Sequence, residues 1–481
     1  MNSIIRLTLI AFMACYYLSG QAQITFEKLI PGVHQAVGWD VVQTSDSGYV
    51  VCGDDYYYYG QWPNYAGTLI KTDQHGNKLW SHLYGLSFEN HLYSVRETSD
   101  GGLIACGSTW ADTMMNSLLL STDSEGEILY IRSYPIRKSG SFARSVRQCD
   151  DQGFIICGSV YPDSSETGMR SYLLKTNSDG DTIWNRLYSS PIDEYGVAVI
   201  CLPDSGFALL SINSDNTEGN TILRKLDGNG IIEWEKIYPA ILGADLAKIN
   251  NDGYIIVGTK LSEPYDKIGL IRTNSSGDST WFKVFPEQAD GNSVAVTEDG
   301  GFLVGGTIYN SPDIGLHQLY LLRTNPNGDP VWTRKWGGTS SDYGASVAVT
   351  FDSGYIFTGY TRKPNTDTIL VYLIKGNEDS TTIGVFEQTS REELYLYPNP
   401  SNGILNIRLH EPAEDILLEI RDILGNSVYS ERISQVSNVL SRRIPVERSG
   451  IYLVTIRTPE YSRTGKVLIH CRDNHPGPSG N

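Results

Sequence analysis

The sequence DSGYVVCG at residues 46–53 decides the fold, because the chain repeats it at intervals of about 50 residues. Each copy is an acidic turn with a glycine followed by an apolar run, and an apolar residue stands seven positions before each turn glycine. Such a turn needs a residue that tolerates positive φ, so each copy predicts a β-hairpin. The other copies are DGGLIACG (100–107), DQGFIICG (151–158), DSGFALLS (204–211), NDGYIIVG (251–258), DGGFLVGG (299–306) and DSGYIFTG (352–359).

A second landmark in each unit is a strand, a polar turn and an aromatic residue four positions after the turn glycine, as in LIKTDQHGNKLW at 69–80. The seventh copy departs from this, with Ser380 for the glycine and Gly384 in the aromatic position. The segment ITFEKLI at 24–30 matches IEWEKIY at 232–238 and places Phe26 in the missing position. We interpret the repeated aromatics as structural: Trp80, Tyr130, Trp184, Trp234, Trp281 and Trp332.

These landmarks predict an all-β fold: a seven-bladed β-propeller over residues 23–386, closed by the N-terminal strand. Closure of the ring removes the exposed edges that an open array of strands would leave. The composition agrees, because 48 glycines and 11% aromatic residues favour short strands and turns. A chain of 481 residues is also too long for one ordinary core.

The N-terminus predicts export. Arg6 precedes an apolar run from Leu7 to Cys15, and small residues precede a cut after residue 22, so residues 1–22 read as a signal peptide. Lipidation of Cys15 is an alternative that the sequence around it fits poorly. No later segment is long and apolar enough to span a bilayer. The net charge of −17 argues against nucleic acid and anionic lipid as partners.

The last part of the chain changes character after a linker at residues 387–394. The motifs YPNPSNG (397–403), Asp422 to Gly425, GIYLVTI (450–456) and GKVLI (465–469) follow one another there, with strand-like alternation. In order and spacing they resemble the type A C-terminal sorting domain of the type IX secretion system of Bacteroidetes-type bacteria. The sorting-signal residues that carry the resemblance are Pro398, Asn399, Pro400, Gly403, Asp422, Gly425, Gly450, Tyr452 and Lys466.

The resemblance implies a sorting domain at residues 395–470, recognised by the secretion machinery at the outer membrane. It further implies that a sortase cleaves the domain and that the protein is secreted or displayed on the cell surface, via the periplasm. Residues 471–481 form a tail beyond the family's usual end. A β-sandwich carbohydrate or adhesion module is the alternative.

Cysteine, metal and catalytic signals are weak. Cys52, Cys106 and Cys157 occupy one position in successive repeats, and sheets packed face to face are too far apart for a disulfide between them, so we expect reduced core residues. Cys149 and Cys201 are interpreted as single strand residues. The histidines show no metal-binding spacing, and no nucleophile motif is present, so we predict no metal, no cofactor and no catalytic residue.

The stretch GDDYYYYGQWPNYAG at 53–67 occurs in one repeat only, in what we expect to be the longest loop of the propeller face. Aromatic faces beside carboxylates suit sugars or peptides. We therefore predict a binding or adhesion platform for an extracellular glycan or protein. An extracellular enzyme acting on carbohydrate or peptide and a passive surface module are the alternatives. The predicted ligand-binding residues are Asp54, Asp55, Tyr56, Tyr57, Tyr58, Tyr59, Trp62 and Tyr65.

Overall fold

The computed structural model divides the chain into two compact units, residues 1–385 and 386–481. No helix among the residues it describes is long and apolar enough to cross a membrane. The predicted signal peptide, linker and tail lie outside the described residues. The structure describes residues 24–377 apart from 60–61, 87–88, 112, 164–167, 190–191, 215–218, 250–251, 263–264, 310–315, 338–339 and 363–367, and residues 395–469 apart from 398–400, 402–403, 409–412, 423–426, 437–438, 446–449 and 459–461.

The first unit is built from antiparallel sheets of four strands, most of them consecutive in sequence. β21 belongs to two sheets, since its first half pairs with β20 and its second half with β22. The sheets of consecutive strands are β2 (Gln35–Gln43), β3 (Tyr49–Tyr59), β4 (Trp62–Thr72) and β5 (Lys78–Tyr84); β6 (Asn90–Glu97), β7 (Leu103–Ala111), β8 (Met114–Thr122) and β9 (Ile128–Tyr134); β10 (Ser141–Gln148), β11 (Phe154–Val160), β12 (Arg170–Thr176) and β13 (Thr182–Tyr188); β14 (Glu194–Cys201), β15 (Phe207–Ser214), β16 (Gly219–Leu226) and β17 (Ile232–Pro239); β18 (Leu242–Lys248), β19 (Tyr254–Lys260), β20 (Lys267–Thr273) and β21 (Ser279–Val296); and β21, β22 (Phe302–Tyr309), β23 (His317–Thr324) and β24 (Pro330–Trp336).

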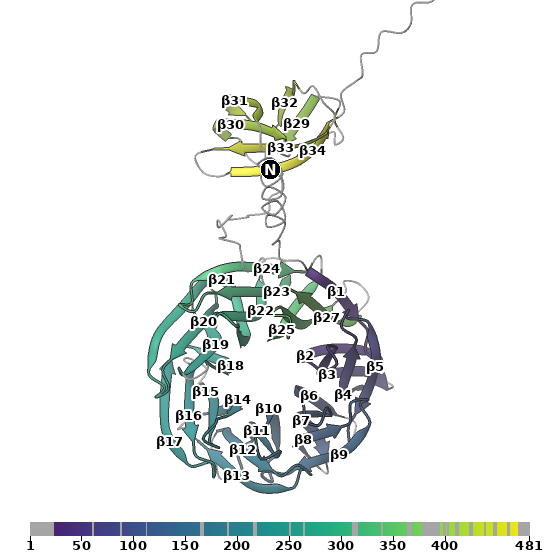
Figure 1. Ribbon diagram of the computed structural model, residues 1–481, viewed down its shortest axis with the longest axis vertical. Coiled ribbons are helices and arrows are strands. Elements are labelled where there is room, and N and C mark those ends of the chain that lie inside the picture. The colour runs from purple at the N-terminus through teal and green to yellow at the C-terminus, as the bar shows by residue number, and fades with distance from the viewer. Residues whose placement is uncertain are drawn as a thin grey trace, which may run out of the picture. The chain divides into compact units, whose positions relative to one another are not determined.

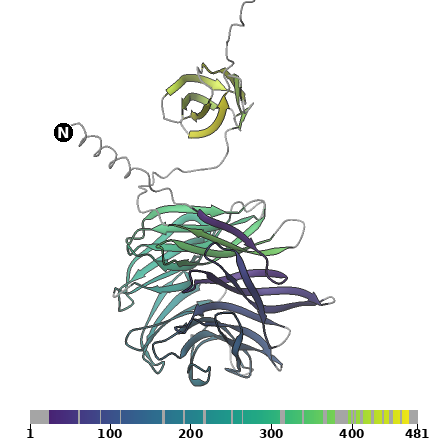
Figure 2. The same cartoon turned by 45° about the vertical axis from the view of Figure 1, so that its right-hand side comes forward.

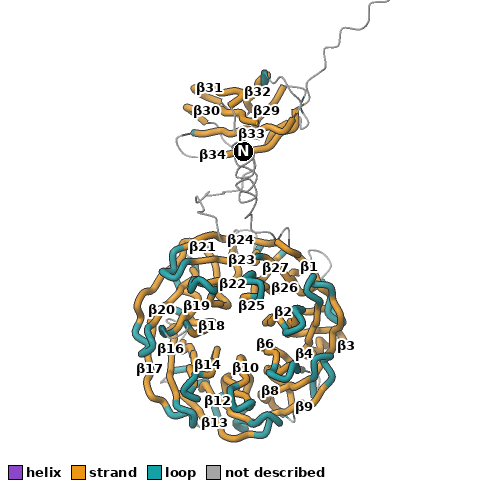
Figure 3. Tube along the Cα trace, in the orientation of Figure 1, coloured by secondary structure: helices purple, strands orange, loops and turns teal. Residues whose placement is uncertain are grey.

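The remaining sheet joins the two ends of this unit. It contains β25 (Ser341–Val349), β26 (Tyr355–Arg362), β27 (Ile369–Gly376) and β1 (Ile24–Ile30), in the order β1-β27-β26-β25. The segment that matches the fourth strand of the other repeats therefore pairs beside β27. The sheets stand in a ring, with the first strand of each nearest the centre and the fourth at the periphery (Figure 1, Figure 3), which gives a propeller-like, all-β region.

The repeated aromatics lock each sheet to the next at the outer edge of the ring. Trp80, at the periphery of the first sheet, packs against Gly126 in the last turn of the second sheet, where an added Cβ would lie 2.8 Å from the indole ring. Gly126 also has a φ of +84°, which glycine adopts without strain. These rings therefore have the structural role that the repeat predicts. The same contact joins Phe26 to Gly76, Tyr130 to Gly180, Trp184 to Gly230, Trp234 to Gly277 and Trp281 to Gly328.

Between the sheets lies an apolar core that includes the predicted cysteines. Cys52, Cys106 and Cys157 are free and fully buried, and burial raises the pKa of each thiol, as expected for reduced core residues. Cys149 and Cys201, in contrast, are not single residues, because they form a disulfide between the β10 and β14 sheets. The bond is possible because the sheets converge towards the centre of the ring, where the two Cα atoms are 5.8 Å apart.

The second unit is a small sandwich of two sheets. One has the order β28-β29-β32 and the other β31-β30-β33-β34. Apolar residues on alternate positions of the strands form a core that includes Leu418, Val454 and Ile456. The strands are β28 (Tyr395–Tyr397), β29 (Ile404–Arg408), β30 (Ala413–Asp422), β31 (Ser427–Val436), β32 (Val439–Arg443), β33 (Gly450–Arg457) and β34 (Ser462–Ile469).

Candidate functional site

A channel runs through the centre of the ring, and a repeated irregularity of the inner strands shapes its wall. In each inner strand the register with the second strand shifts by one residue, so that one residue is left unpaired. A bulge of this kind turns a side chain out of the sheet. Each unpaired residue lines the channel, and the set is Trp39, Tyr93, Arg144, Val197, Ala244, Asn292 and Ala345.

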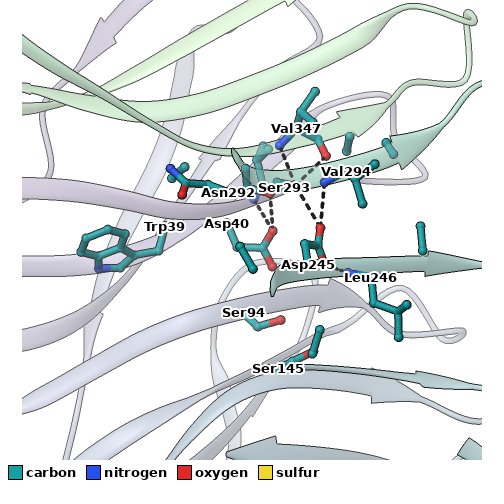
Figure 4. A pocket seen from close by; sticks show the side chains of 18 of the residues that line it. Trp39, Asp40, Ser94, Ser145, Asp245, Leu246, Asn292, Ser293, Val294 and Val347 are labelled. Carbon is teal, nitrogen blue, oxygen red and sulfur yellow. Dashed lines mark hydrogen bonds between the residues drawn. The ribbon is translucent and has the colours of Figure 1, made fainter. Parts of the chain in front are cut away.

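Two adjoining cavities occupy the channel. The mouth cavity, of about 540 Å³, lies at the end where the second and third strands of each sheet are joined, and Tyr309 and Tyr360 reach it from β22 and β26. The inner cavity, of about 420 Å³, extends along the inner strands towards the Asp-x-Gly turns, and Figure 4 shows side chains such as Asp40 and Asp245 within it. Both volumes lie in the range of small-molecule sites.

Aromatic rings from four neighbouring sheets meet at the mouth cavity. The Trp39 ring lies 5.7 Å from Tyr360 and 6.4 Å from Tyr93, measured between centroids. Tyr360 in turn stacks on Tyr343 at 4.8 Å, and His317 lies 4.8 Å from Tyr343. Flat rings grouped in this way offer stacking surfaces to the apolar face of a ligand.

Polar groups stand among these rings. The Arg144 guanidinium lies over the Tyr93 ring at 4.8 Å, and its side chain is exposed. Asp290 accepts hydrogen bonds from the hydroxyls of Tyr309 and Thr259, and burial raises the pKa of its carboxyl group. Asn292 donates to the carbonyl oxygen of Gly344 over 2.8 Å. The mouth cavity thus combines a cation, a carboxyl group and an amide with aromatic walls.

The tyrosine run lies on strands, whereas the sequence suggested a loop. Residues 53–59 belong to β3 and continue its pairing with β4, so that Tyr56 faces Tyr65 and Tyr59 faces Trp62 across an extended hairpin. Each of the two strands has 11 residues, and Figure 2 shows this pair in dark purple, ending in a short grey tip. The side chains of Tyr58, Tyr59 and Trp62 lie outside the described residues.

The other tyrosines of the hairpin contact neighbouring aromatic and histidine rings. Tyr57 stacks on His34 at 4.7 Å, and Tyr56 lies 5.9 Å from Tyr65. Tyr65 in turn lies 5.2 Å from His91, which stacks on Tyr93 of the mouth cavity at 5.8 Å. The hairpin is therefore connected to the mouth cavity by a continuous series of rings.

Asp54 and Asp55 are buried and hold neighbouring groups in place. Asp55 is fully buried and accepts hydrogen bonds from the backbone N–H groups of Val33 and His34, at 2.7 and 2.9 Å. Asp54 accepts a hydrogen bond of 2.8 Å from the indole N–H of Trp39 and lies 3.2 Å from Nδ1 of His91. Asp54 therefore fixes the orientation of the tryptophan that lines the mouth cavity.

Trp39, Tyr93, Arg144, Tyr343 and Tyr360 were not singled out from the sequence. A signal for the bulged residues does exist, because each of them stands nine positions before the turn glycine of its repeat. The residue type at this position differs from repeat to repeat, so a search for recurring residues passes over it. In the part of the chain that the structure describes, no group of three His, Cys, Asp or Glu side chains is placed to hold a metal ion.

The sorting-signal residues of the second unit fall partly on described strands. Asp422 ends β30 opposite Tyr452 of β33, and the Tyr452 ring is buried in the sandwich core. Gly450 begins β33 and Lys466 lies on β34. Pro398, Asn399, Pro400, Gly403 and Gly425 lie outside the described residues.

Residues 395–470 match the model of the secretion system C-terminal sorting domain. This part of the chain is such a sorting domain. The sorting domain marks proteins that the type IX secretion system exports to the cell surface or the extracellular space. The matched residues contain all the strands of the sandwich, from β28 to β34.

Several solved structures resemble the chain at low sequence identity. The match to puromycin hydrolase has 12% identity and a TM-score of 0.48, and it covers 82% of this chain and 62% of the hydrolase. The periplasmic gluconolactonase of Pseudomonas aeruginosa matches with 11% identity and a TM-score of 0.44, covering 69% of this chain and 97% of that one. A protein of unknown function from Bacteroides caccae has 12% identity and a TM-score of 0.40, with 59% and 94% covered. No curated protein matches the chain.

Proposed function

We propose that the first unit is a seven-bladed β-propeller, closed by β1, that binds an extracellular glycan at the mouth of its channel after export by the type IX secretion system. One observation carries the proposal: Trp39, Tyr93, Tyr343 and Tyr360 line a single cavity of about 540 Å³. Sugar rings have apolar faces that stack on aromatic side chains, and their hydroxyl groups bond to amides and charged groups. Both kinds of partner surround this cavity.

The pairing of β1 with β27 supports the role of a rigid platform. Backbone pairing joins residues 24–30 to residues 371–376, at opposite ends of the first unit. A closed ring leaves no free strand edge at its junction. The mouth cavity is then bounded by strands from every side, so its aromatic rings are held in place before a ligand arrives. Preorganisation of this kind lowers the entropic cost of binding.

The β3–β4 hairpin extends the proposed surface. Tyr56, Tyr57, Tyr58, Tyr59, Trp62 and Tyr65 are proposed to contact the parts of a longer glycan that project beyond the mouth. Asp54 and Asp55 support this contact from within, by the hydrogen bonds to Trp39 and to the backbone of His34. A sortase is the further proposed partner, which removes the sorting domain once the protein has crossed the outer membrane.

Binding is favoured over hydrolysis by the distribution of carboxyl groups. Most glycosidases place two carboxyl groups on either side of the bond that they cleave. Asp290 is the one carboxylate among the described residues that line the mouth cavity, while Asp40 and Asp245 line the inner cavity. We therefore assign Asp290 to hydrogen bonding with ligand hydroxyl groups.

A glycan array probed with the full mature chain tests the proposal. The variants Trp39→Ala and Tyr360→Ala are expected to lose most of the signal, because each removes a stacking surface at the mouth. Phe351→Ala is the matched control, since Phe351 is an exposed aromatic beside an Asp-x-Gly turn, at the opposite end of the sheets. Equal binding by all variants would refute the assignment. If the protein hydrolyses a bound glycan and Asp290→Asn abolishes that turnover, the first unit is an enzyme and not a binding platform.

A further inference from the structure

The inner strands connect neighbouring sheets through a belt of small, mostly polar side chains around the channel. The residue after each bulge is Asp40, Ser94, Ser145, Ala198, Asp245, Ser293 or Ser346. Asp40 accepts a hydrogen bond from the backbone N–H of Val95 in the next sheet, and Asp245 does the same for Val294. Figure 4 shows Asp40, Ser94 and Asp245 around the inner cavity. The residue at this position thus accepts the same inter-sheet hydrogen bond in more than one sheet.

Between the β2 and β6 sheets, this belt contains a complete ion pair. Arg96 donates to Oδ2 of Asp40 over 2.5 Å and also to the carbonyl oxygen of Val95. Oδ1 of Asp40 accepts a hydrogen bond of 2.8 Å from the Ser346 hydroxyl group. Burial alone would raise the pKa of Asp40, but Arg96 and Ser346 lower it, so the carboxylate stays ionised. Each charged group of this pair has its partner.

Between the β6 and β10 sheets, the equivalent pair is incomplete. Arg147 stands six residues before its turn glycine, as Arg96 does, and donates to the preceding carbonyl group, that of Val146, over 2.8 Å. Ser94, however, takes the place of Asp40. Among the described residues no carboxylate lies within ion-pair distance of Arg147, whose one other hydrogen bond goes to the Ser145 hydroxyl group.

Ser94 gives an independent sign of a missing group at this position. Its side chain lines the inner cavity, the residue is 3% exposed, and its hydroxyl oxygen has no hydrogen-bond partner among the described residues. Buried hydroxyl groups in folded proteins are nearly always hydrogen-bonded. A hydrogen-bond acceptor located between Ser94 and Arg147 would give the Ser94 hydroxyl group a partner and the Arg147 guanidinium group an ion pair.

The charges of the inner cavity favour an anion as that acceptor. The chain as a whole carries a net charge of −17, yet the inner cavity is lined by four cations, Arg96, Arg144, Arg147 and Lys248, and by two carboxylates. One of these carboxylates, Asp40, is paired with Arg96, and the other, Asp245, is bonded to the backbone N–H groups of Leu246 and Val294. Burial and the charge of Arg96 lower the pKa of Arg147 to about 10. A bound anion would relieve that repulsion.

We propose that the inner cavity binds the carboxylate of an external organic anion between Ser94 and Arg147, at the position that Asp40 fills one sheet earlier. A guanidinium group binds a carboxylate through two parallel hydrogen bonds, and the serine hydroxyl donates a third. The aromatic residues next to these positions in sequence are Trp39 and Tyr93, which line both cavities. A carboxylated sugar bound here has its ring beside them.

Calorimetric titration of the full mature chain, in a buffer without small anions, tests this site. The probes are glucuronate, glucose and acetate. Glucuronate is expected to bind and glucose to bind at least about tenfold more weakly, the loss that follows from removing one charge-assisted hydrogen bond. If acetate binds as tightly as glucuronate, the cavity is a site for small carboxylates. If acetate binds more weakly than glucuronate, the cavity is a site for acidic sugars. Equal binding of glucuronate and glucose overturns the proposal.

Three variants separate this site from the aromatic mouth. Arg147→Met is expected to weaken glucuronate by at least about tenfold. Ser94→Asp supplies an internal carboxylate, and it is expected to abolish glucuronate binding and to raise the melting temperature. Asp40→Ser frees Arg96 and is expected to add a second carboxylate site. If Arg147→Met and Ser94→Asp both leave the affinity for glucuronate unchanged, the proposed anion site is refuted. This holds even if Trp39→Ala abolishes the binding of neutral glycans at the mouth, which is a separate proposal.

Discussion

The two ends of the propeller-like sheets differ in how strictly the sequence repeats. At the acidic turns of six repeats the same contact recurs, in which the turn aspartate pairs with a buried or partly buried lysine or arginine of the third strand. At the channel mouth, the bulged position carries a different residue type in almost every repeat. The turn pairs are Asp46 with Lys71, Asp151 with Lys175, Asp204 with Lys225, Asp252 with Arg272, Asp299 with Arg323 and Asp352 with Lys375.

The difference shows what the backbone requires and what it leaves free. All the inner strands share one bulge, yet its residue ranges from Ala244 to Trp39. The turns need their aspartates because an Asp side chain accepts the turn N–H groups and fixes the hairpin, as Asp46 does for Gly48. Positions that repeat therefore hold the sheets in the ring, and positions that vary determine which side chains line the channel.

The disulfide is the strongest test of this contrast between repeated structural positions and variable channel positions, because it is a structural bond at positions that do not repeat. The double variant Cys149→Ser with Cys201→Ser is expected to lose about 4 kcal/mol of the free energy of unfolding, since the bond closes a loop of 52 residues. Chemical denaturation of the oxidised proteins measures the loss. Cys52→Ser is no substitute as a control, because it places a hydroxyl group in the core. The reduced wild-type protein serves instead and is expected to match the double variant.

Removal of an aromatic side chain at the repeated outer position should have the next largest effect on stability. Trp234→Ala is expected to cost about 3 kcal/mol, at the low end for tryptophan because the ring is only half-buried against Gly277. Leu129→Ala is the control, since Leu129 is a strand residue with 61% of its surface exposed. Unfolding curves in urea compare the two. If both variants are equally stable, the outer aromatics do not hold the sheets together.

Glycine positions in the turns separate backbone strain from the loss of packing space. Gly277 and Gly101 both have positive φ, but a Cβ at Gly277 would lie 2.6 Å from the Trp234 ring, whereas a Cβ at Gly101 has no atom within 4 Å. Gly101→Ala is expected to cost about 1 kcal/mol from strain alone. Gly277→Ala should cost about 2 kcal/mol, because the displaced ring adds to the strain. Equal melting temperatures would contradict the interlocking contact.

The smallest expected effect is a pH dependence at the channel mouth. Burial lowers the pKa of His91, but the carboxylates of Asp54 and Glu89 outweigh burial and raise it above its usual 6.5. The ion pair therefore stabilises the fold fully below about pH 6.5 and is lost as the pH rises through the higher folded-state value. We expect a loss of less than about 1 kcal/mol. Melting temperatures from pH 5 to 9 measure it, and His91→Gln should remove this part of the dependence.

Much of the fold was predictable from the sequence because every sheet of the ring is built from the same strand and turn pattern. The turn glycines, the apolar strands and the aromatic positions each occur often enough to align without a structure. The position of Phe26 predicted that residues 24–30 belong beside the last repeat, and β1 does pair with β27. The sorting domain was recognised from motifs that occur in a fixed order.

The candidate site was less predictable, for a physical reason. Trp39 and Tyr93 are 54 residues apart, on the inner strands of two neighbouring sheets, and nothing local in the sequence shows that both point into one channel. The tyrosine run attracted attention through its composition, although Asp54 and Asp55 within it are buried. The disulfide could not be predicted from the sequence, because Cys149 and Cys201 lie 52 residues apart and nothing local shows that the fold brings them together.

The pairing of β1 with β27 also sets an order in time. A ribosome completes β1 some 340 residues before β27, so the ring cannot close during most of the synthesis of the chain. Contacts between such distant segments form late, because closing a long loop costs entropy. Until then the chain has two open strand edges, at which other chains could pair. β27 ends at Gly376, before the sorting domain begins at residue 395, so the ring can close before any of the sorting domain has been made. Pulse-labelled protease protection of nascent chains, with and without residues 24–30, would show whether protection begins only once β27 has been made.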